Sequence, residues 1–291
     1  MEEHNNLSDN AIFESAFGET KTIKSVITFL SYIKKIQLSN AENPCELLFR
    51  GHSNTSYPLL PSIGRSKNRN LLYDLNQEET IFLKFKSVFH LYADDRPLSD
   101  IDLLFLAQHY GLPTKVLDWT YDYKVGLYFA LTDIIDSEKE DSDGVLWAFN
   151  YKLFENNPFE NEMFFNRLHF YRPEYDNNPN LRAQRGLFSF IIDDVHNQNK
   201  QSLEDIIINE LKSKKEYNQE EWSDFKDPRV LPPQIKIDKP IFYKFIIKKD
   251  KKPEMLKELY SEGYSEEYLF PGFDGVKKAM RNSVILEEKL K

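Results

Sequence analysis

The chain of 291 residues is 41% apolar and 29% charged, and aromatic residues make up 14% of it. Disordered chains lack that much apolar and ring surface, so the composition excludes wholesale disorder. A single cysteine, Cys45, excludes an intrachain disulfide framework and a zinc site built from several cysteines. The net charge of −9 gives no general attraction to nucleic acid or to an anionic membrane, so only a local basic patch would bind either.

The start of the chain does not look like a targeting segment. Residues 1–6 contain neither the basic nor the apolar region of a secretory signal. No apolar stretch approaches the roughly 18 residues that a membrane-spanning helix needs. We therefore expect a cytoplasmic protein without a membrane partner.

Helices and strands are predicted from the spacing of apolar residues. After a polar arm over 1–19, apolar residues at steps of three and four predict a first helix over 20–38. The predicted strands are short apolar runs at 45–50, 145–149, 187–192 and 241–247, with a short extended piece at 115–118. The further predicted helices lie at 77–92, between Ser99 and Gly111, and at 123–135, 203–211, 253–261 and 274–281.

Several helix ends carry recognisable signals. Ser99, with Asp102 three residues later, is typical of a helix start, and Gly111 and Gly263 are suited to follow helix ends. The remaining segments have no clear period and are expected to be irregular or linking: 52–75, 136–143, 155–180 and 212–234. Because strands and helices do not alternate regularly, the sequence predicts an α+β fold with a mixed or antiparallel sheet core and packed helices.

Motifs of several common enzyme classes are missing from the sequence. It has no dinucleotide fingerprint, no Walker-type phosphate loop, no zinc-protease motif and no nucleophile elbow. The stretch from Asp141 to Gly144 resembles the middle of a calcium loop, but Asn150 stands where the bidentate carboxylate is needed. The six histidines have no histidine or cysteine partner at ligand spacing, so we predict no metal site.

One unusual segment is the end of the first predicted strand, Leu48 to His52. An arginine at the end of an apolar strand is costly to bury without a partner. The planar guanidinium of Arg50 is suited to grip a carboxylate or a phosphate. The alternative interpretation is a structural salt bridge at a strand end.

A second unusual segment runs from Leu106 to Ala130. Its polar side chains stand among apolar ones and must be paired, either with each other or with a ligand. These polar residues are Gln108, His109, Thr114, Asp118 and Thr120. Asp118, Trp119 and Thr120 also stand just before a predicted helix, whose N-terminus would suit an anion. The alternative is a capped helix with a buried network around Trp119.

Together these segments resemble the FRG domain family, which is named for its Phe-Arg-Gly motif, here Phe49-Arg50-Gly51. The other matching stretches run from Gln108 to Thr114, Leu117 to Thr120, Leu127 to Ala130 and Arg182 to Phe188. The chain departs from the family pattern at Lys115, where arginine is common, and at Gly126, where alanine is common.

The resemblance covers about residues 41–193 and implies a division of the chain. We expect an N-terminal arm and helix over 1–40 and an FRG domain over 41–291, with a C-terminal extension of helices and a strand. The family occurs in bacteria and their phages and is discussed beside defence and toxin systems. The resemblance therefore implies an effector in phage defence or a toxin.

A more distant resemblance is to ADP-ribosyltransferases, which carry an Arg-Gly pair after a first strand and a Ser or Thr on a second. It implies an ADP-ribosyltransferase-like fold and NAD⁺ as co-substrate. The residues to which it gives catalytic roles are Arg50, His109, Asp118, Thr120 and Gln184. The residues to which it gives cofactor contacts are Gly51, Gln108, Tyr110, Trp119, Phe129 and Arg182.

The departure from the transferase pattern that bears most on function concerns their catalytic acid. They place a glutamate on a later strand, where this chain has Gln184, and an amide cannot act as a base. Asp118 is the carboxylate inside the dense motif that is able to replace it. In cleavage of the N-glycosidic bond of NAD⁺, a carboxylate would stabilise the cationic ribose.

Three functions follow from these observations. The first is an NAD⁺-using ADP-ribosyltransferase or NAD⁺ hydrolase, whose protein or nucleic-acid acceptor the sequence does not identify. The second is a non-catalytic module that senses a nucleotide-type small molecule or another ligand for a defence system. A nuclease comes last, because the sequence has no convincing carboxylate cluster for a metal.

Overall fold

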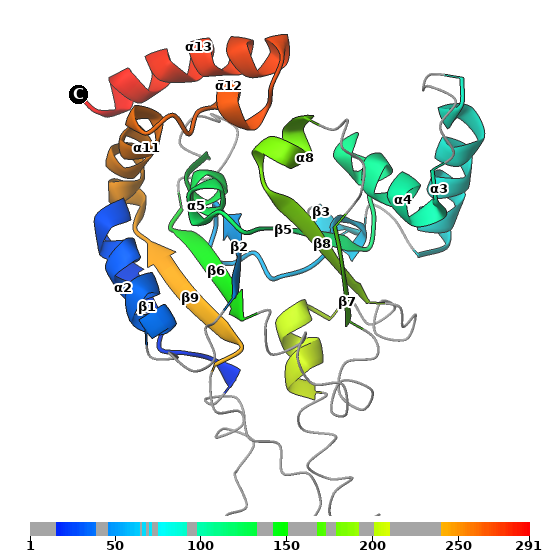
Figure 1. Ribbon diagram of the computed structural model, residues 1–291, viewed down its shortest axis with the longest axis horizontal. Helices are drawn as coiled ribbons and strands as arrows, with labels where there is room; N and C mark the ends of the chain where they lie inside the picture. Colours follow the sequence, from blue (N-terminus) through cyan, green and yellow to red (C-terminus); the bar gives the residue numbers. More distant parts are fainter. Residues whose placement is uncertain are drawn as a thin grey trace, which may run out of the picture.

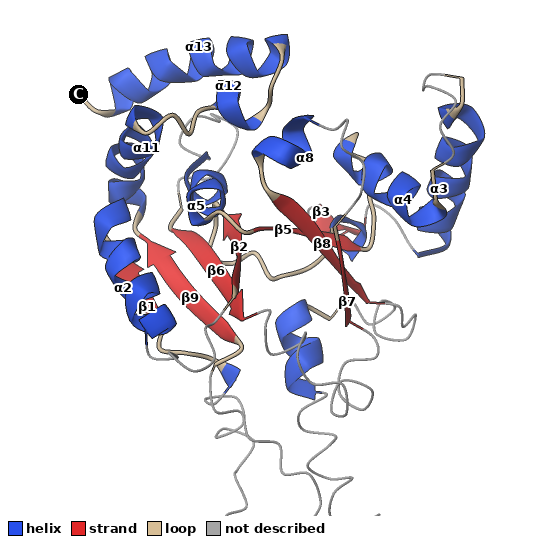
Figure 2. Cartoon of the chain, in the orientation of Figure 1, coloured by secondary structure: helices blue, strands red, loops and turns tan. Residues whose placement is uncertain are grey.

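A computed structural model describes residues 16–38, 46–64, 66–67, 70–71, 75–91, 98–132, 142–150, 168–172, 179–191, 201–209 and 240–291. Its centre is a seven-stranded sheet with the strand order β1-β9-β6-β2-β5-β8-β7 (Figures 1 and 2). The strands of this sheet are β1 (Lys21–Ile23), β2 (Leu47–His52), β5 (Val116–Thr120), β6 (Gly144–Asn150), β7 (Leu168–Tyr171), β8 (Gly186–Ile191) and β9 (Phe242–Ile247). Only β1 and β9 pair in parallel among these strands, so the sheet is mixed and largely antiparallel.

Helices pack against both faces of the sheet, which confirms the predicted α+β fold. They are α2 (Val26–Leu38), α3 (Leu75–Phe89), α4 (Asp100–His109), α5 (Tyr123–Leu131), α8 (Pro179–Ala183), α11 (Lys252–Ser261), α12 (Glu266–Leu269) and α13 (Phe273–Lys289), with a further helix at 203–209. None of the described helices has both the length and the apolar run that crossing a membrane requires.

The two faces of β2 pack against two different parts of the core. Leu47 and Phe49 join a cluster that contains residues of α2, α5 and α11, whereas Leu48 joins a second cluster with the helix at 203–209. This alternation is the period of two that a strand imposes on its side chains. Strand β6 is buried at every position, as expected for a strand covered on both faces.

The predicted helix at 20–38 is wrong in its first turn. Residues Lys21–Ile23 form β1, because Ile23 pairs with Ile247 of β9 and is fully buried. The helix begins only after Ser25, whose hydroxyl accepts a hydrogen bond from the Thr28 amide at 3.1 Å. Pairing with a distant strand thus outweighs the local helical pattern.

Other boundaries also differ from the prediction. The segment 52–75 contains a short hairpin of β3 (Ser66–Lys67) and β4 (Asn70–Leu71), and 155–180 contains β7 and the start of α8. Helix α5 ends at Leu131 instead of 135, and α13 continues to Lys289 instead of 281. Residues 16–19 are not a loose arm, since Phe17 stacks on Phe242. The linker at 212–234 lies outside the described residues.

The predicted helix ends at Ser99, Gly111 and Gly263 are confirmed. The Ser99 hydroxyl accepts a hydrogen bond from the Asp102 amide at 3.2 Å at the start of α4. Gly111 and Gly263 adopt φ angles of 83° and 87° just beyond α4 and α11. Glycine adopts this left-handed backbone without the penalty that other residues incur.

A buried carboxylate fixes the C-terminal helices over α5. Glu266, at 1% exposure, accepts hydrogen bonds from Tyr128 (2.9 Å), Tyr260 (2.7 Å) and Asn282 (2.7 Å). These donors come from α5, α11 and α13, so the carboxylate joins three helices. Burial and this carboxylate raise the pKa of both Tyr128 and Tyr260, which keeps the phenols protonated as donors.

Glu266→Ala is expected to lower the free energy of unfolding by about 3 kcal/mol, because two buried donors and the partly buried Tyr260 lose their acceptor. Chemical denaturation monitored by circular dichroism measures the loss. Glu267→Ala, one residue along and exposed, is the matched control and should change stability by less than about 0.5 kcal/mol. Equal stability of the two variants would contradict the role given to Glu266.

Candidate functional site

The two motifs come together at a cleft of about 730 Å³. Strands β2 and β5 pair antiparallel with Phe49 opposite Thr120, which brings the Phe-Arg-Gly motif beside the Asp-Trp-Thr motif. The cleft is lined by every residue for which the sequence predicted a role except Tyr110 and Arg182. Its volume lies within the range of roughly 300–1,000 Å³ that is common for small-molecule sites.

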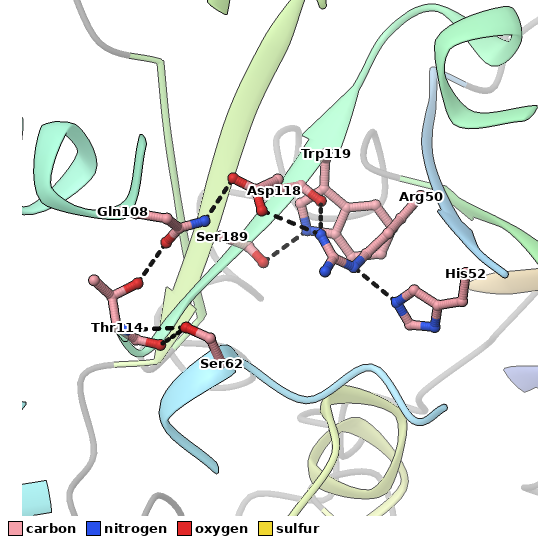
Figure 3. A network of polar contacts seen from close by, with 8 residues as sticks. All are labelled: Arg50, His52, Ser62, Gln108, Thr114, Asp118, Trp119 and Ser189. Carbon is pink, nitrogen blue, oxygen red and sulfur yellow. Dashed lines mark hydrogen bonds and ion pairs between the residues drawn. The ribbon is translucent and has the colours of Figure 1, made fainter. Parts of the chain in front are cut away.

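Arg50 lies at the wall of this cleft with part of its guanidinium engaged (Figure 3). Its Nη1 donates to the carbonyl oxygen of Asp118 at 2.7 Å and lies 3.4 Å from the Asp118 carboxylate, and its Nε donates to His52 at 3.0 Å. Nη2 makes no hydrogen bond to any residue that the structure describes. Burial lowers the pKa of Arg50, and Asp118 opposes the shift. The guanidinium is thus held in a fixed orientation, and its Nη2 is left to bind a ligand.

The partner of Arg50 that the sequence analysis missed is His52. It follows Arg50 by two residues on β2, and side chains two residues apart share one side of a strand. Its Nε2 accepts from Arg50, so the ring proton is on Nδ1, which lies 3.1 Å from the carbonyl oxygen of Tyr57. This period of two was the signal that would have indicated the contact.

Asp118 is held in place by a chain of side chains, although it is 58% exposed. Gln108 donates to its carboxylate at 2.5 Å and accepts from the Thr114 hydroxyl at 2.5 Å. The Thr114 amide in turn donates to Ser62 at 3.0 Å, as Figure 3 shows. Both ends of the Gln108 amide are therefore occupied within the protein, and the side chain positions Asp118.

Thr120 and Gln184 connect segments of the cleft wall. The Thr120 hydroxyl donates to the carbonyl oxygen of Gln184 at 2.7 Å and accepts from the Asp122 amide at 3.0 Å. The side-chain amide of Gln184 donates to the carbonyl oxygen of Leu269 at 3.1 Å. These contacts join β5, the start of β8 and α12. Neither hydrogen bond of the Thr120 hydroxyl goes to Arg50.

Trp119 contributes its ring to the core. The ring is 2% exposed, its Nε1 donates to Ser189 at 2.8 Å, and it packs on Phe149. The expected stacking of this indole on a nucleotide is therefore not what its surroundings favour. The buried network around Trp119 is the alternative that the sequence analysis left open.

The N-terminus of α5 is closed by a carboxylate of the protein itself. Asp122 accepts a hydrogen bond from the Lys124 amide at 2.9 Å, and its other oxygen accepts from the Tyr264 hydroxyl at 2.8 Å. The capped helix that the sequence analysis offered as an alternative is thus observed. The Asp122 carboxylate would repel an anion at this helix end, so the structure favours the capped helix over the expected anion site.

The other predicted residues differ in their distance from the cleft. His109 lines it; burial lowers the pKa of His109, and Asp118 opposes the shift, so the ring is neutral at pH 7. Phe129 also lines it and packs edge-to-face against Phe270. Tyr110 is 68% exposed and, like Arg182 on α8, does not line the cleft.

Gly51 has a structural reason for its place in the motif. A Cβ atom there would lie 1.9 Å from the carbonyl oxygen of Gly126 in α5. Gly126 itself faces Phe49, whose Cβ would be 3.0 Å from an added methyl group. The glycine pair lets helix α5 cross β2 at close range, which sets the floor of the cleft beside Arg50.

Comparison with protein families gave a match to the FRG domain over residues 45–139. Neither the search of curated proteins nor the search of solved structures gave a match. The matched segment contains Arg50, Gly51, Gln108, His109 and Asp118, all of which line the cleft. Residues 45–139 of this chain therefore match an FRG domain.

Proposed function

We propose that this FRG-domain protein binds NAD⁺ in the cleft and cleaves its nicotinamide bond, as an ADP-ribosyltransferase or an NAD⁺ hydrolase. The observation that carries the proposal is Arg50, which Asp118 and His52 orient at the wall of a ligand-sized cleft and whose Nη2 has no partner among the described residues. A guanidinium held in this way is suited to grip a phosphate or a ribose hydroxyl.

The chemistry assigns roles to the neighbours of Arg50. Cleavage of the N-glycosidic bond develops positive charge on the ribose, which the Asp118 carboxylate would stabilise. Asp118 is suited to this role because it is exposed at the cleft and held by Gln108. The neutral ring of His109 would form a hydrogen bond with a ligand hydroxyl or carbonyl.

The test is incubation of the purified protein with NAD⁺, with free nicotinamide measured by chromatography and binding measured by calorimetry. If the wild-type protein releases more nicotinamide than an Asp118→Asn variant, the result supports enzymatic cleavage of NAD⁺. If the protein neither releases nicotinamide nor binds NAD⁺, the proposal as a whole is contradicted. Binding without release would replace it by the second candidate.

That second candidate is a non-catalytic module that senses a nucleotide. It is favoured by Gln184, which stands where the transferases place a glutamate and whose amide donates to the carbonyl oxygen of Leu269. An amide committed to the backbone supplies no acid or base. In either form, we propose that the protein acts in the cytoplasm, where NAD⁺ is available, as an effector in phage defence or as a toxin.

A further inference from the structure

The wall of the cleft opposite the FRG motifs is built by the C-terminal segment. Residues 270–274 and Lys278 line the cleft, and they lie outside the matched residues 45–139. Figure 1 shows α12 and α13, in orange and red, crossing above α5 and beside α8. The cleft is thus closed on one side by residues with no motif of their own.

Two side chains of this segment are exposed at the cleft and form no hydrogen bond or ion pair with the residues that the structure describes. Phe273 is 95% exposed, although it lines the cleft. Lys278 lines it too and forms no ion pair within the described part of the chain; its Nζ lies 5.0 Å from the centre of the Phe270 ring. The acidic neighbour Asp274 pairs with Lys277 at 2.8 Å and also interacts electrostatically with Lys278, without an ion pair between the two.

An exposed ring and an exposed ammonium group at one wall match two parts of a nucleotide. A phenyl ring stacks on a nucleobase of any identity, and lysine binds phosphate as a point charge. Arg50 supplies the second cation, from β2 on the FRG side of the same cleft. A ligand with a phosphate bridge and a base beyond it would contact both walls.

We propose that Phe273 and Lys278 form a second subsite, which takes the adenosine phosphate half of the ligand. This inference rests on the proposed function, since it assigns the two halves of NAD⁺ to two walls of the cleft. The nicotinamide half then lies beside Arg50, His109 and Asp118. The C-terminal segment thereby selects dinucleotides over mononucleotides.

The subsite is held in place before a ligand binds. Glu266 ties α12 to α5, α11 and α13, and the Gln184 amide ties the end of α12 to the FRG side. Gly272, with a φ of 129°, allows the turn that directly precedes Phe273. Pre-organisation of this kind lowers the cost of binding.

The experiment is calorimetric titration of the full chain with NAD⁺, ADP-ribose and nicotinamide mononucleotide. Phe273→Ala and Lys278→Gln should each raise the Kd for NAD⁺ and ADP-ribose about tenfold. The Kd for nicotinamide mononucleotide, which lacks the adenosine phosphate, should stay unchanged. The matched controls are Met280→Ala and Arg281→Gln, which alter exposed residues of the same helix outside the cleft.

The outcomes separate this inference from the function on which it rests. If the wild-type protein binds none of the three ligands, both fail. If it binds NAD⁺ and all four variants bind it equally well, the second subsite is refuted and the proposed function stands. If the variants lose affinity for NAD⁺ and for nicotinamide mononucleotide equally, the subsite is also refuted. The substitutions would then disturb the whole cleft and not the contacts to the adenosine phosphate.

Discussion

Arg50→Gln is expected to weaken NAD⁺ binding by about 100-fold and to reduce nicotinamide release to background. The change removes a charged donor whose hydrogen bonds to a phosphate contribute up to about 3 kcal/mol. Arg50→Lys keeps the charge but loses the planar fork, so it should fall between the wild type and Arg50→Gln. Calorimetry and a nicotinamide assay measure the two effects.

The structural alternative for Arg50 is tested on the same samples. Its contacts to Asp118 and His52 also join β2 to β5, so a loss of stability would accompany a purely structural role. Arg172→Gln, an exposed arginine outside the cleft, is the matched control and should leave binding unchanged. If Arg50→Gln melts far below this control and still binds NAD⁺ normally when folded, Arg50 is a structural residue.

The sequence was sufficient to predict the strands that lie inside the sheet. Strands β2, β6 and β9 are apolar runs bounded by polar residues, and their burial on both faces makes such runs easy to find. The sequence predicts β1 as the start of a helix because the strand with which it pairs, β9, lies at the other end of the sequence. Strand β7 has only four residues, all partly exposed, and so short a run does not stand out from the Asn- and Pro-rich segment around it.

The site was predictable as a set of residues but not as a geometry. Arg50 and Asp118 are 68 residues apart, and only the pairing of β2 with β5 brings them into contact. The motifs also contain residues whose role is structural, and sequence alone does not separate these from the others. Trp119 is the clearest example, since its indole nitrogen is satisfied by Ser189 in the core.

The C-terminal wall of the cleft could not be predicted from sequence motifs. Phe273 and Lys278 belong to no motif and lie on a helix that was predicted only in part. Their place at the cleft follows from the contacts of Glu266, a glutamate that is unremarkable in the sequence. Buried polar hubs of this kind are visible only in three dimensions.

Gly51→Ala is expected to lower the free energy of unfolding by about 3 kcal/mol or more. The added Cβ would lie 1.9 Å from the carbonyl oxygen of Gly126 and 2.6 Å from the amide nitrogen of Ala130. Both are backbone atoms of α5, which cannot rotate away as a side chain can. The buried helix must therefore shift as a whole against β2, which breaks packing across the core.

The unfolding midpoint in guanidinium chloride measures this loss, and Gly64→Ala is its matched control. The atoms nearest to a Cβ on Gly64 belong to the flexible side chain of Leu60, at 3.1 Å, so that variant should lose less than about 1 kcal/mol. Equal stability of the two variants would mean that α5 has room to move away from β2. The glycine of the Phe-Arg-Gly motif would then be needed for ligand contact, as the sequence analysis first assigned it, and not for packing.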